Sequence, residues 1–129
     1  MAQYADVIEI VAPSQASPGS KVDVTVRVKN LYSAAIGIMI AGALEYGVTP
    51  WPGIDFPESY ANAGAGVTYS FSGSFVMPDC RVTIHAYSYW YGADGYWYFD
   101  DEMTKVINPA AAIESQFGSI EIVSYERRP

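Results

Sequence analysis

Hydrophobic and polar positions alternate in short runs along most of the chain, and turn residues separate these runs. The clearest alternation covers residues 21–30, where Val22, Val24, Val26 and Val28 fall on one side and charged or polar residues fall on the other. A period of two is typical of a β-strand with one buried face. Helical periodicity is nearly absent, and turn residues recur about every dozen positions. The sequence therefore predicts an all-β sandwich.

The same pattern predicts strands elsewhere, at residues 5–11, 34–46, 67–77, 80–91, 96–107 and 119–126. In the segment 34–46, Ile36, Ile38 and Ile40 share one face, and small residues between them permit close backbone approach or a bulge. We interpret this segment as a central strand, with a short helix as the minor alternative. The Asp-Gly pair within residues 92–95 favours a tight turn, so 80–91 and 96–107 should form a hairpin.

Residues 48–66 contain several prolines and glycines, which oppose regular structure. We predict a long loop that crosses the sandwich, and long loops of this kind are often functional.

The C-terminal part of the chain carries an internal echo. The motif Ile8-Glu9-Ile10-Val11 recurs at residues 120–123. Chance explains four matching residues in a β-rich chain, and the alternative is a strand that begins a following domain or is offered to a neighbouring copy. We treat residues 1–129 as one domain, in which 108–118 are a connection and 119–129 are a terminal strand.

Two stretches carry a resemblance to a known family, ADVIEIVAPSQASPGSKVDVTVRVKN and GSFVMPDCRVTIHA. With their Pro-Gly turn, valine alternation and Phe-x-Met-Pro turn, they resemble immunoglobulin-like repeats of the cell-adhesion-related type found in prokaryotic surface and phage-borne proteins. The resemblance extends loosely over residues 5–107. It implies an immunoglobulin-like antiparallel β-sandwich of about seven to eight strands, used for display, adhesion or particle decoration, and it implies no catalytic residue.

Charge and composition limit the classes of partner that the chain is expected to bind. The formal charge is −7, and only 7 residues are Lys or Arg, which disfavours nucleic acid and anionic membranes. No apolar run approaches the roughly 20 residues of a membrane span, and the N-terminus lacks a secretion signal. Richness in Tyr, Gly, Ser and Thr is nevertheless typical of surface proteins. We therefore expect a virion or extracellular surface location, reached by release on lysis or as a piece of a longer exported chain.

Few residues offer chemistry. Nucleophilic catalysis by Ser or Cys needs a histidine base, and His85 is the only one, in the middle of a predicted strand and on its outer face. Cys80 is alone and is expected to be a small buried residue or an inert thiol. One histidine and one cysteine are too few ligands for zinc. We predict neither an enzyme nor a cofactor.

Three consecutive acidic residues, Asp100, Asp101 and Glu102, offer the one cluster of hard oxygen ligands. Strict alternation points Asp100 and Glu102 one way and Asp101 the other. We interpret them as the solvated side chains of an edge strand. The alternative is a calcium site completed by Asp94 from the turn.

The strongest signal for binding is the aromatic hairpin at residues 87–99, YSYWYGADGYWYF, in which eight of thirteen residues are aromatic. Alternation separates Tyr87, Tyr89 and Tyr91 from Ser88 and Trp90, so both faces of the hairpin carry rings although only one can be core. Tyrosine-rich outer faces serve in protein interfaces, in sugar stacking or in plain cross-strand stabilisation. The predicted binding residues are Tyr87, Tyr89, Trp90, Tyr91, Tyr96, Trp97, Tyr98 and, from the long loop, Trp51.

Two functions are compatible with these residues. The first is a non-enzymatic structural or adhesion module that forms a homo-oligomer, or contacts other surface or virion proteins, through its Tyr-rich face. The second is a carbohydrate-binding module in which Trp51, the outer tyrosines and either Trp90 or Trp97 form a glycan-stacking platform near the hairpin tip.

Overall fold

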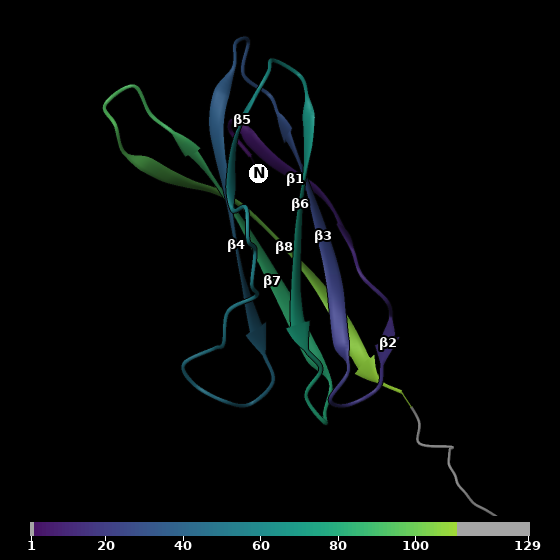
Figure 1. Ribbon diagram of the computed structural model, residues 1–129. Helices are drawn as coiled ribbons and strands as arrows, with labels where there is room; N and C mark the ends of the chain where they lie inside the picture. Colours follow the sequence, from purple (N-terminus) through teal and green to yellow (C-terminus); the bar gives the residue numbers. More distant parts are fainter. Residues whose placement is uncertain (1, 111–129) are drawn as a thin grey trace, which may run out of the picture.

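A computed structural model describes residues 2–110, which form two packed β-sheets (Figure 1). The first sheet contains, in spatial order, β1 (Ala5–Val11), β3 (Lys21–Asn30) and β6 (Thr68–Val76). The second contains β2 (Gln15–Ala16), β8 (Trp97–Pro109), β7 (Val82–Tyr91), β4 (Ile36–Glu45) and β5 (Tyr60–Ala63). All neighbours are antiparallel except β2 and β8. The all-β prediction is confirmed, and no helix in residues 2–110 is long and apolar enough to cross a membrane.

The core lies where the alternation predicts it. The four alternating valines of β3 are at most 2% exposed and face the second sheet together with Phe71 of β6. From that sheet, Ile38 and Ile40 of β4 and Ile84 of β7 are equally buried. Period-two patterning therefore determines which face of each strand is removed from water.

The predicted crossing loop exists and fills the core between β4 and β6. Ile54 and Phe56 are buried, and Asp55 forms both backbone hydrogen bonds to Ser74 of β6. A Cβ at Gly42 would lie 2.7 Å from Cδ1 of Ile54, so glycine in β4 allows the close approach. The prediction that residues 48–66 contain no regular structure is wrong at their end, where β5 pairs with residues 36–39 of β4.

Two smaller expectations need correction. The strand predicted to begin at Cys80 begins at Val82, and Cys80 lies exposed after the Pro78-Asp79 turn, with its Sγ 3.7 Å from the carbonyl oxygen of Tyr46. A buried thiol at this position is therefore wrong. The predicted terminal strand at 119–126 lies outside the described residues.

Side chains of the second sheet cover the free edge of β1. Asp100 accepts the backbone N–H groups of Gln3, Tyr4 and Ala5, at 2.6, 2.8 and 2.6 Å. Asp101 accepts the N–H of Val7 at 3.0 Å. An uncovered edge of this kind would offer unpaired groups to another chain. The carboxylates therefore take the place of a neighbouring strand.

A β-bulge explains why strict alternation fails in this acidic run. Tyr89 pairs with Phe99 and Ser88 pairs with Asp101, so Asp100 is an extra residue in β8. The bulge sends Asp100 and Asp101 toward β1 and leaves Glu102 on the outer face. The interpretation of all three as solvated side chains is therefore wrong for Asp100 and Asp101, which are engaged by backbone N–H groups.

Candidate binding surfaces of the aromatic hairpin

The β7–β8 hairpin extends beyond the two sheets and ends in a tight turn, at the upper left of Figure 1. The turn closes with a hydrogen bond from the N–H of Gly92 to the carbonyl of Tyr96, and Gly95 has a φ of 86°, which favours glycine. Residues opposite each other on antiparallel strands share a face. The pair Tyr91–Trp97 therefore lies on one face of the hairpin, and the pair Trp90–Tyr98 on the other.

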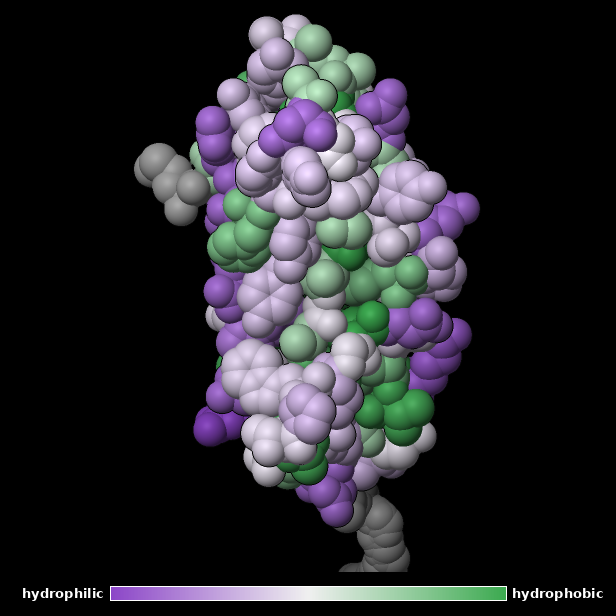
Figure 2. Space-filling view, turned by 90° about the vertical axis from the view of Figure 1, so that its left-hand side faces the viewer, coloured by the Kyte–Doolittle hydropathy of each residue, from purple (hydrophilic) through white to green (hydrophobic). Residues whose placement is uncertain are grey.

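One face of the hairpin continues over the outer side of the second sheet. We call this the outer aromatic surface, and its members are Trp51, Tyr60, His85, Tyr87, Tyr89, Tyr91, Trp97 and Phe99. Figure 2 views the molecule from the side on which the hairpin projects, and pale aromatic and green apolar residues occupy its middle, with most of the hydrophilic residues at its flanks. Tyr60 is 68% exposed and Phe99 56%, so the surface is open to a partner.

Rings on the outer aromatic surface mostly meet one another at steep angles. Tyr91 and Trp97 are inclined at 62°, Tyr89 and Phe99 at 71°, and Tyr60 and Trp97 at 64°. Trp97 packs closely on β4 beneath these rings, because Gly37 has no side chain. Cη2 of Trp97 lies 3.4 Å from the position that a Cβ on Gly37 would occupy. The rings therefore form an uneven, interlocked surface.

His85 lies between two carboxylates on this surface. Its Nδ1 is 2.7 Å from Oε2 of Glu102 and its Nε2 is 2.8 Å from Oε1 of Glu45, and Trp51 stacks on its ring at 4.6 Å. A neutral imidazole has one N–H, so only the charged form donates to both carboxylates. Burial alone would lower the pKa of His85, but hydrogen bonds and charge from Glu102 and Glu45 raise it above its ordinary value.

This arrangement predicts a pH-dependent contribution to stability. Because the pKa is raised in the folded state, His85 stabilises the fold most below the ordinary pKa, and this contribution disappears as pH rises through the raised pKa. We expect His85→Gln to lower the free energy of unfolding by roughly 1 kcal/mol near pH 6, since both carboxylates are about half exposed. The difference from the native chain should shrink as pH rises through the raised pKa of His85.

Urea unfolding of both chains across this pH range measures the effect. Lys21→Gln is the control, because within residues 2–110 Lys21 makes only an exposed ion pair with Asp23 at 3.9 Å. A difference between native chain and His85→Gln that stays constant from acid to alkaline pH would contradict the prediction.

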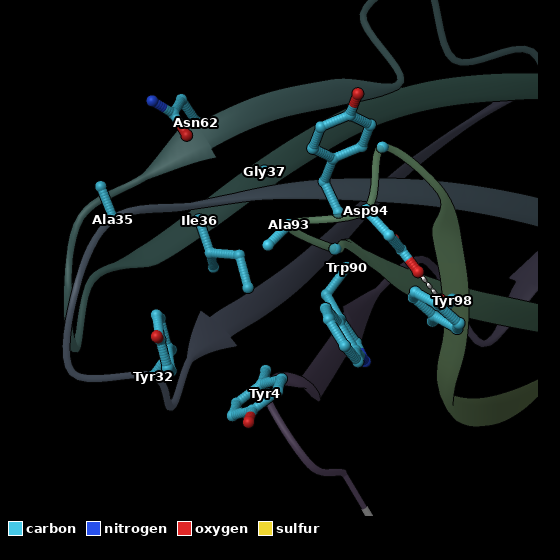
Figure 3. A pocket seen from close by; sticks show the side chains of 13 residues that line it. Tyr4, Tyr32, Ala35, Ile36, Gly37, Asn62, Trp90, Ala93, Asp94 and Tyr98 are labelled. Atoms are coloured by element: carbon cyan, nitrogen blue, oxygen red, sulfur yellow. Dashed lines mark hydrogen bonds between the residues drawn. The ribbon is translucent and has the colours of Figure 1, made fainter.

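The opposite face of the hairpin forms a second site, an open cavity of about 800 Å³ that we call the hairpin cleft (Figure 3). Five aromatic side chains contribute to its lining, Tyr4, Tyr32, Trp90, Tyr91 and Tyr98. Trp90 stacks on Tyr98 at 4.8 Å and 27°, and Tyr4 stands perpendicular to Trp90 at 4.9 Å and 89°. The rings come from three separate parts of the chain and converge on one space.

Hydrogen bonds fix the walls of the hairpin cleft. Asp100 holds the backbone of Tyr4, and the side-chain oxygen of Asn30 accepts the N–H of Tyr32 at 2.8 Å. At the rim, Asp94 accepts the N–H of Tyr96 at 3.1 Å and the phenol of Tyr98. The hydrogen bond from Tyr98 and the one from the Tyr96 backbone lower the pKa of Asp94. Asp94 is therefore a fixed negative charge beside the aromatic walls.

The structure divides the predicted binding residues between two faces. Tyr87, Tyr89, Tyr91, Trp97 and Trp51 belong to the outer aromatic surface. Trp90 and Tyr98 line the hairpin cleft, to which Tyr91 also contributes, and Tyr96 is 69% exposed beside the turn. A single platform that combines Trp51 with Trp90 is therefore wrong, because alternation in β7 places Trp90 on the opposite face from His85, on which Trp51 stacks.

Sequence reasoning missed contributors that lie far from the hairpin in the chain. Tyr60, on β5, belongs to the outer aromatic surface. Tyr4, directly before β1, and Tyr32, in the turn after β3, line the hairpin cleft. Their single aromatic rings carry no local signal. Only the pairing of distant strands brings them to the hairpin.

Acidic side chains do not gather into a metal site in the described part of the chain. Among residues 2–110, no three His, Cys, Asp or Glu side chains are grouped so that they could hold a metal ion. The proposed calcium ligands are separated, since Glu102 binds His85 on the outer face while Asp100 and Asp101 hold β1. These three residues are thus not arranged as a calcium site.

The sequence matches no protein-family model and no curated protein. Solved structures, by contrast, share its fold. One is the alkylpurine DNA glycosylase AlkC of Pseudomonas fluorescens, bound to DNA containing an abasic site analogue, with a TM-score of 0.60 and 11% identity. The match covers 84% of this chain but only 31% of that one, so the chain corresponds to about a third of the glycosylase.

Two further structures correspond to nearly whole domains. The CARDB domain of the PF1109 protein from Pyrococcus furiosus, solved with di-metal ions, has a TM-score of 0.58 and 11% identity, over 84% of this chain and 91% of that one. The PKD domain of an M14-like peptidase from a Thermoplasmatales archaeon has a TM-score of 0.51 and 12% identity, over 86% and 100%. Both are immunoglobulin-like sandwiches, so residues 2–110 of this chain adopt an immunoglobulin-like β-sandwich.

Proposed function

We propose that this chain is a non-enzymatic assembly or adhesion module that contacts neighbouring subunits through its outer aromatic surface. The observation that carries the proposal is the extent and chemistry of that surface, where exposed tyrosines and tryptophans gather on one sheet face. Isolated exposed apolar residues are common, but a contiguous patch marks an interaction site. Tyr and Trp are the residues most enriched at protein interfaces.

Ring orientation favours a protein partner over a glycan. A sugar stacks on a ring face that is open to solvent, whereas Trp51, His85 and Tyr87 turn their faces toward one another at 4.6 and 6.2 Å. The remaining rings are mutually inclined by 59° to 71°. An uneven surface of ring edges and phenols suits an interlocking side-chain interface, so the carbohydrate-binding alternative has less support.

The surroundings in which such a module would work belong to the same proposal. The likeness of residues 5–107 to cell-adhesion-related repeats of prokaryotic surface and phage-borne proteins supports a virion or extracellular surface location. The glycosylase neighbour was solved with DNA, but a net charge of −7 opposes extending that partner to this chain. We therefore propose protein subunits, a second copy of this chain first among them.

Light scattering of the full chain over a concentration series tests the proposal. We expect a mass that rises with concentration, and a double variant Tyr60→Ser/Phe99→Ser that weakens self-association on the order of 10- to 100-fold. Both side chains are exposed, so the fold should persist. Val76→Ser is the matched control, because Val76 is 66% exposed on β6 in the other sheet. A strict monomer at every concentration would contradict homo-assembly.

A further inference from the structure

The hairpin cleft lies on the opposite face of the hairpin from the proposed assembly surface and shares only Tyr91 with it. It is also unusual in its lining. Rings from five positions line it, an acidic side chain stands at its rim, and within residues 2–110 no Lys, Arg or His lines it. This lining therefore does not suit a phosphate or carboxylate ligand, which needs basic residues.

From this lining we infer that the hairpin cleft binds a small organic cation that carries a methylated ammonium group. Aromatic rings attract a cation placed within about 6 Å of their centroids. Tyr4 lies 4.9 Å from Trp90 and 5.0 Å from Tyr32, and the ring planes meet at 89° and 71°. These rings contact one another edge to face, so they form one continuous aromatic wall against which a compact ammonium group can lie (Figure 3).

The carboxylate of the hairpin cleft favours a cation over a sugar. Both carboxylate oxygens of Asp94 are already engaged, Oδ1 by the N–H of Tyr96 and Oδ2 by the phenol of Tyr98. A sugar needs acceptors and donors that are free to bond its hydroxyls, and an engaged carboxylate offers few. A cation needs only negative charge at close range, which Asp94 supplies while remaining bonded.

The cleft walls are also held in place before any ligand arrives. Leu31 donates its N–H to the carbonyl of Tyr4 at 2.7 Å, which fixes the turn that carries Tyr32 beside Tyr4. Trp90 is partly buried against the core, with Tyr98 stacked on it. A site that is already formed loses less entropy on binding.

Choline titrated into the ¹⁵N-labelled full chain, followed by NMR, tests the inference. We expect saturable shifts at the amides of Tyr4 and Tyr32 and at the indole N–H of Trp90, with a millimolar Kd. The neutral isostere 3,3-dimethyl-1-butanol should bind about 10-fold more weakly. Equal affinity for the two compounds, or no shift up to about 100 mM choline, would overturn the inference, as would saturable binding of glucose or cellobiose at the same residues in place of choline.

Variants separate the charge of the site from its shape. Asp94→Asn should weaken choline binding roughly 3- to 10-fold, whereas Tyr98→Phe, which keeps the ring on Trp90, should change it less than about 2-fold. The double variant Tyr60→Ser/Phe99→Ser should bind choline as the native chain does, so failure of the assembly proposal leaves this result unaffected. An Asp94→Asn chain with native affinity would contradict the role of the carboxylate.

Comparing choline with phosphocholine then distinguishes a free ammonium compound from a headgroup, because the added phosphate would meet an acidic rim.

Discussion

Replacing Asn30 by aspartate is expected to lower the free energy of unfolding by about 3–5 kcal/mol. Asn30 is fully buried at the end of β3, and its amide nitrogen lies 2.9, 3.0 and 3.0 Å from the carbonyl oxygens of Ala34, Ala63 and Gly64. Aspartate keeps the oxygen that accepts the N–H of Tyr32 but loses both N–H donors. It would place a buried charge against three carbonyl oxygens.

Urea unfolding at neutral pH measures the loss through the midpoint at an unchanged slope. Asn108→Asp is the matched control, because Asn108 is exposed on β8 and the same chemical change there should cost under about 0.5 kcal/mol. Since Asn30 also fixes the turn that carries Tyr32, the hairpin cleft should lose choline affinity in the Asn30→Asp chain. A loss below about 1 kcal/mol would show that these carbonyls find other donors.

The strands that the sequence predicts well are those with one buried face and regular alternation. β1 and β3 have the predicted bounds, and the inward residues of β7 are the predicted Val82, Ile84 and Ala86. Here local patterning and tertiary burial agree, because each side chain of a strand points to one of only two faces of the sheet. β5 was missed because a four-residue edge strand depends on pairing with β4, and its own residues, Tyr60–Ala63, carry little pattern.

The candidate sites were predictable only in part, for a related reason. The density of rings in residues 87–99 predicted the hairpin as a candidate binding element, and alternation separated Trp90 from Tyr89 and Tyr91. The β-bulge at Asp100 could not be predicted from the sequence, because one extra residue in a strand does not change the composition of the strand noticeably. It reverses the faces of the residues that follow, and so brings Glu102 to His85 and Asp101 to β1.

The bulge makes Asp100 the residue whose loss should most affect the edge of the first sheet. We expect Asp100→Ala to lower the free energy of unfolding by about 2–4 kcal/mol, because three backbone N–H groups at residues 3–5 lose a charged acceptor. Partial access of water to this edge limits the loss. Asp23→Ala is the control, since Asp23 is exposed on β3 and, in the described part of the chain, makes only a long ion pair with Lys21.

The same variant separates two roles of the edge of β1. If Asp100 acts only on stability, Asp100→Ala unfolds at lower urea and associates no more than the native chain does. If the carboxylate also shields the edge, the freed N–H groups offer a template for another chain, and the folded variant should aggregate with time at concentrations where the native chain does not. Light scattering below the unfolding transition measures this directly. We expect aggregation, because Asp101 covers only the N–H of Val7 and leaves those of Gln3, Tyr4 and Ala5 unpaired.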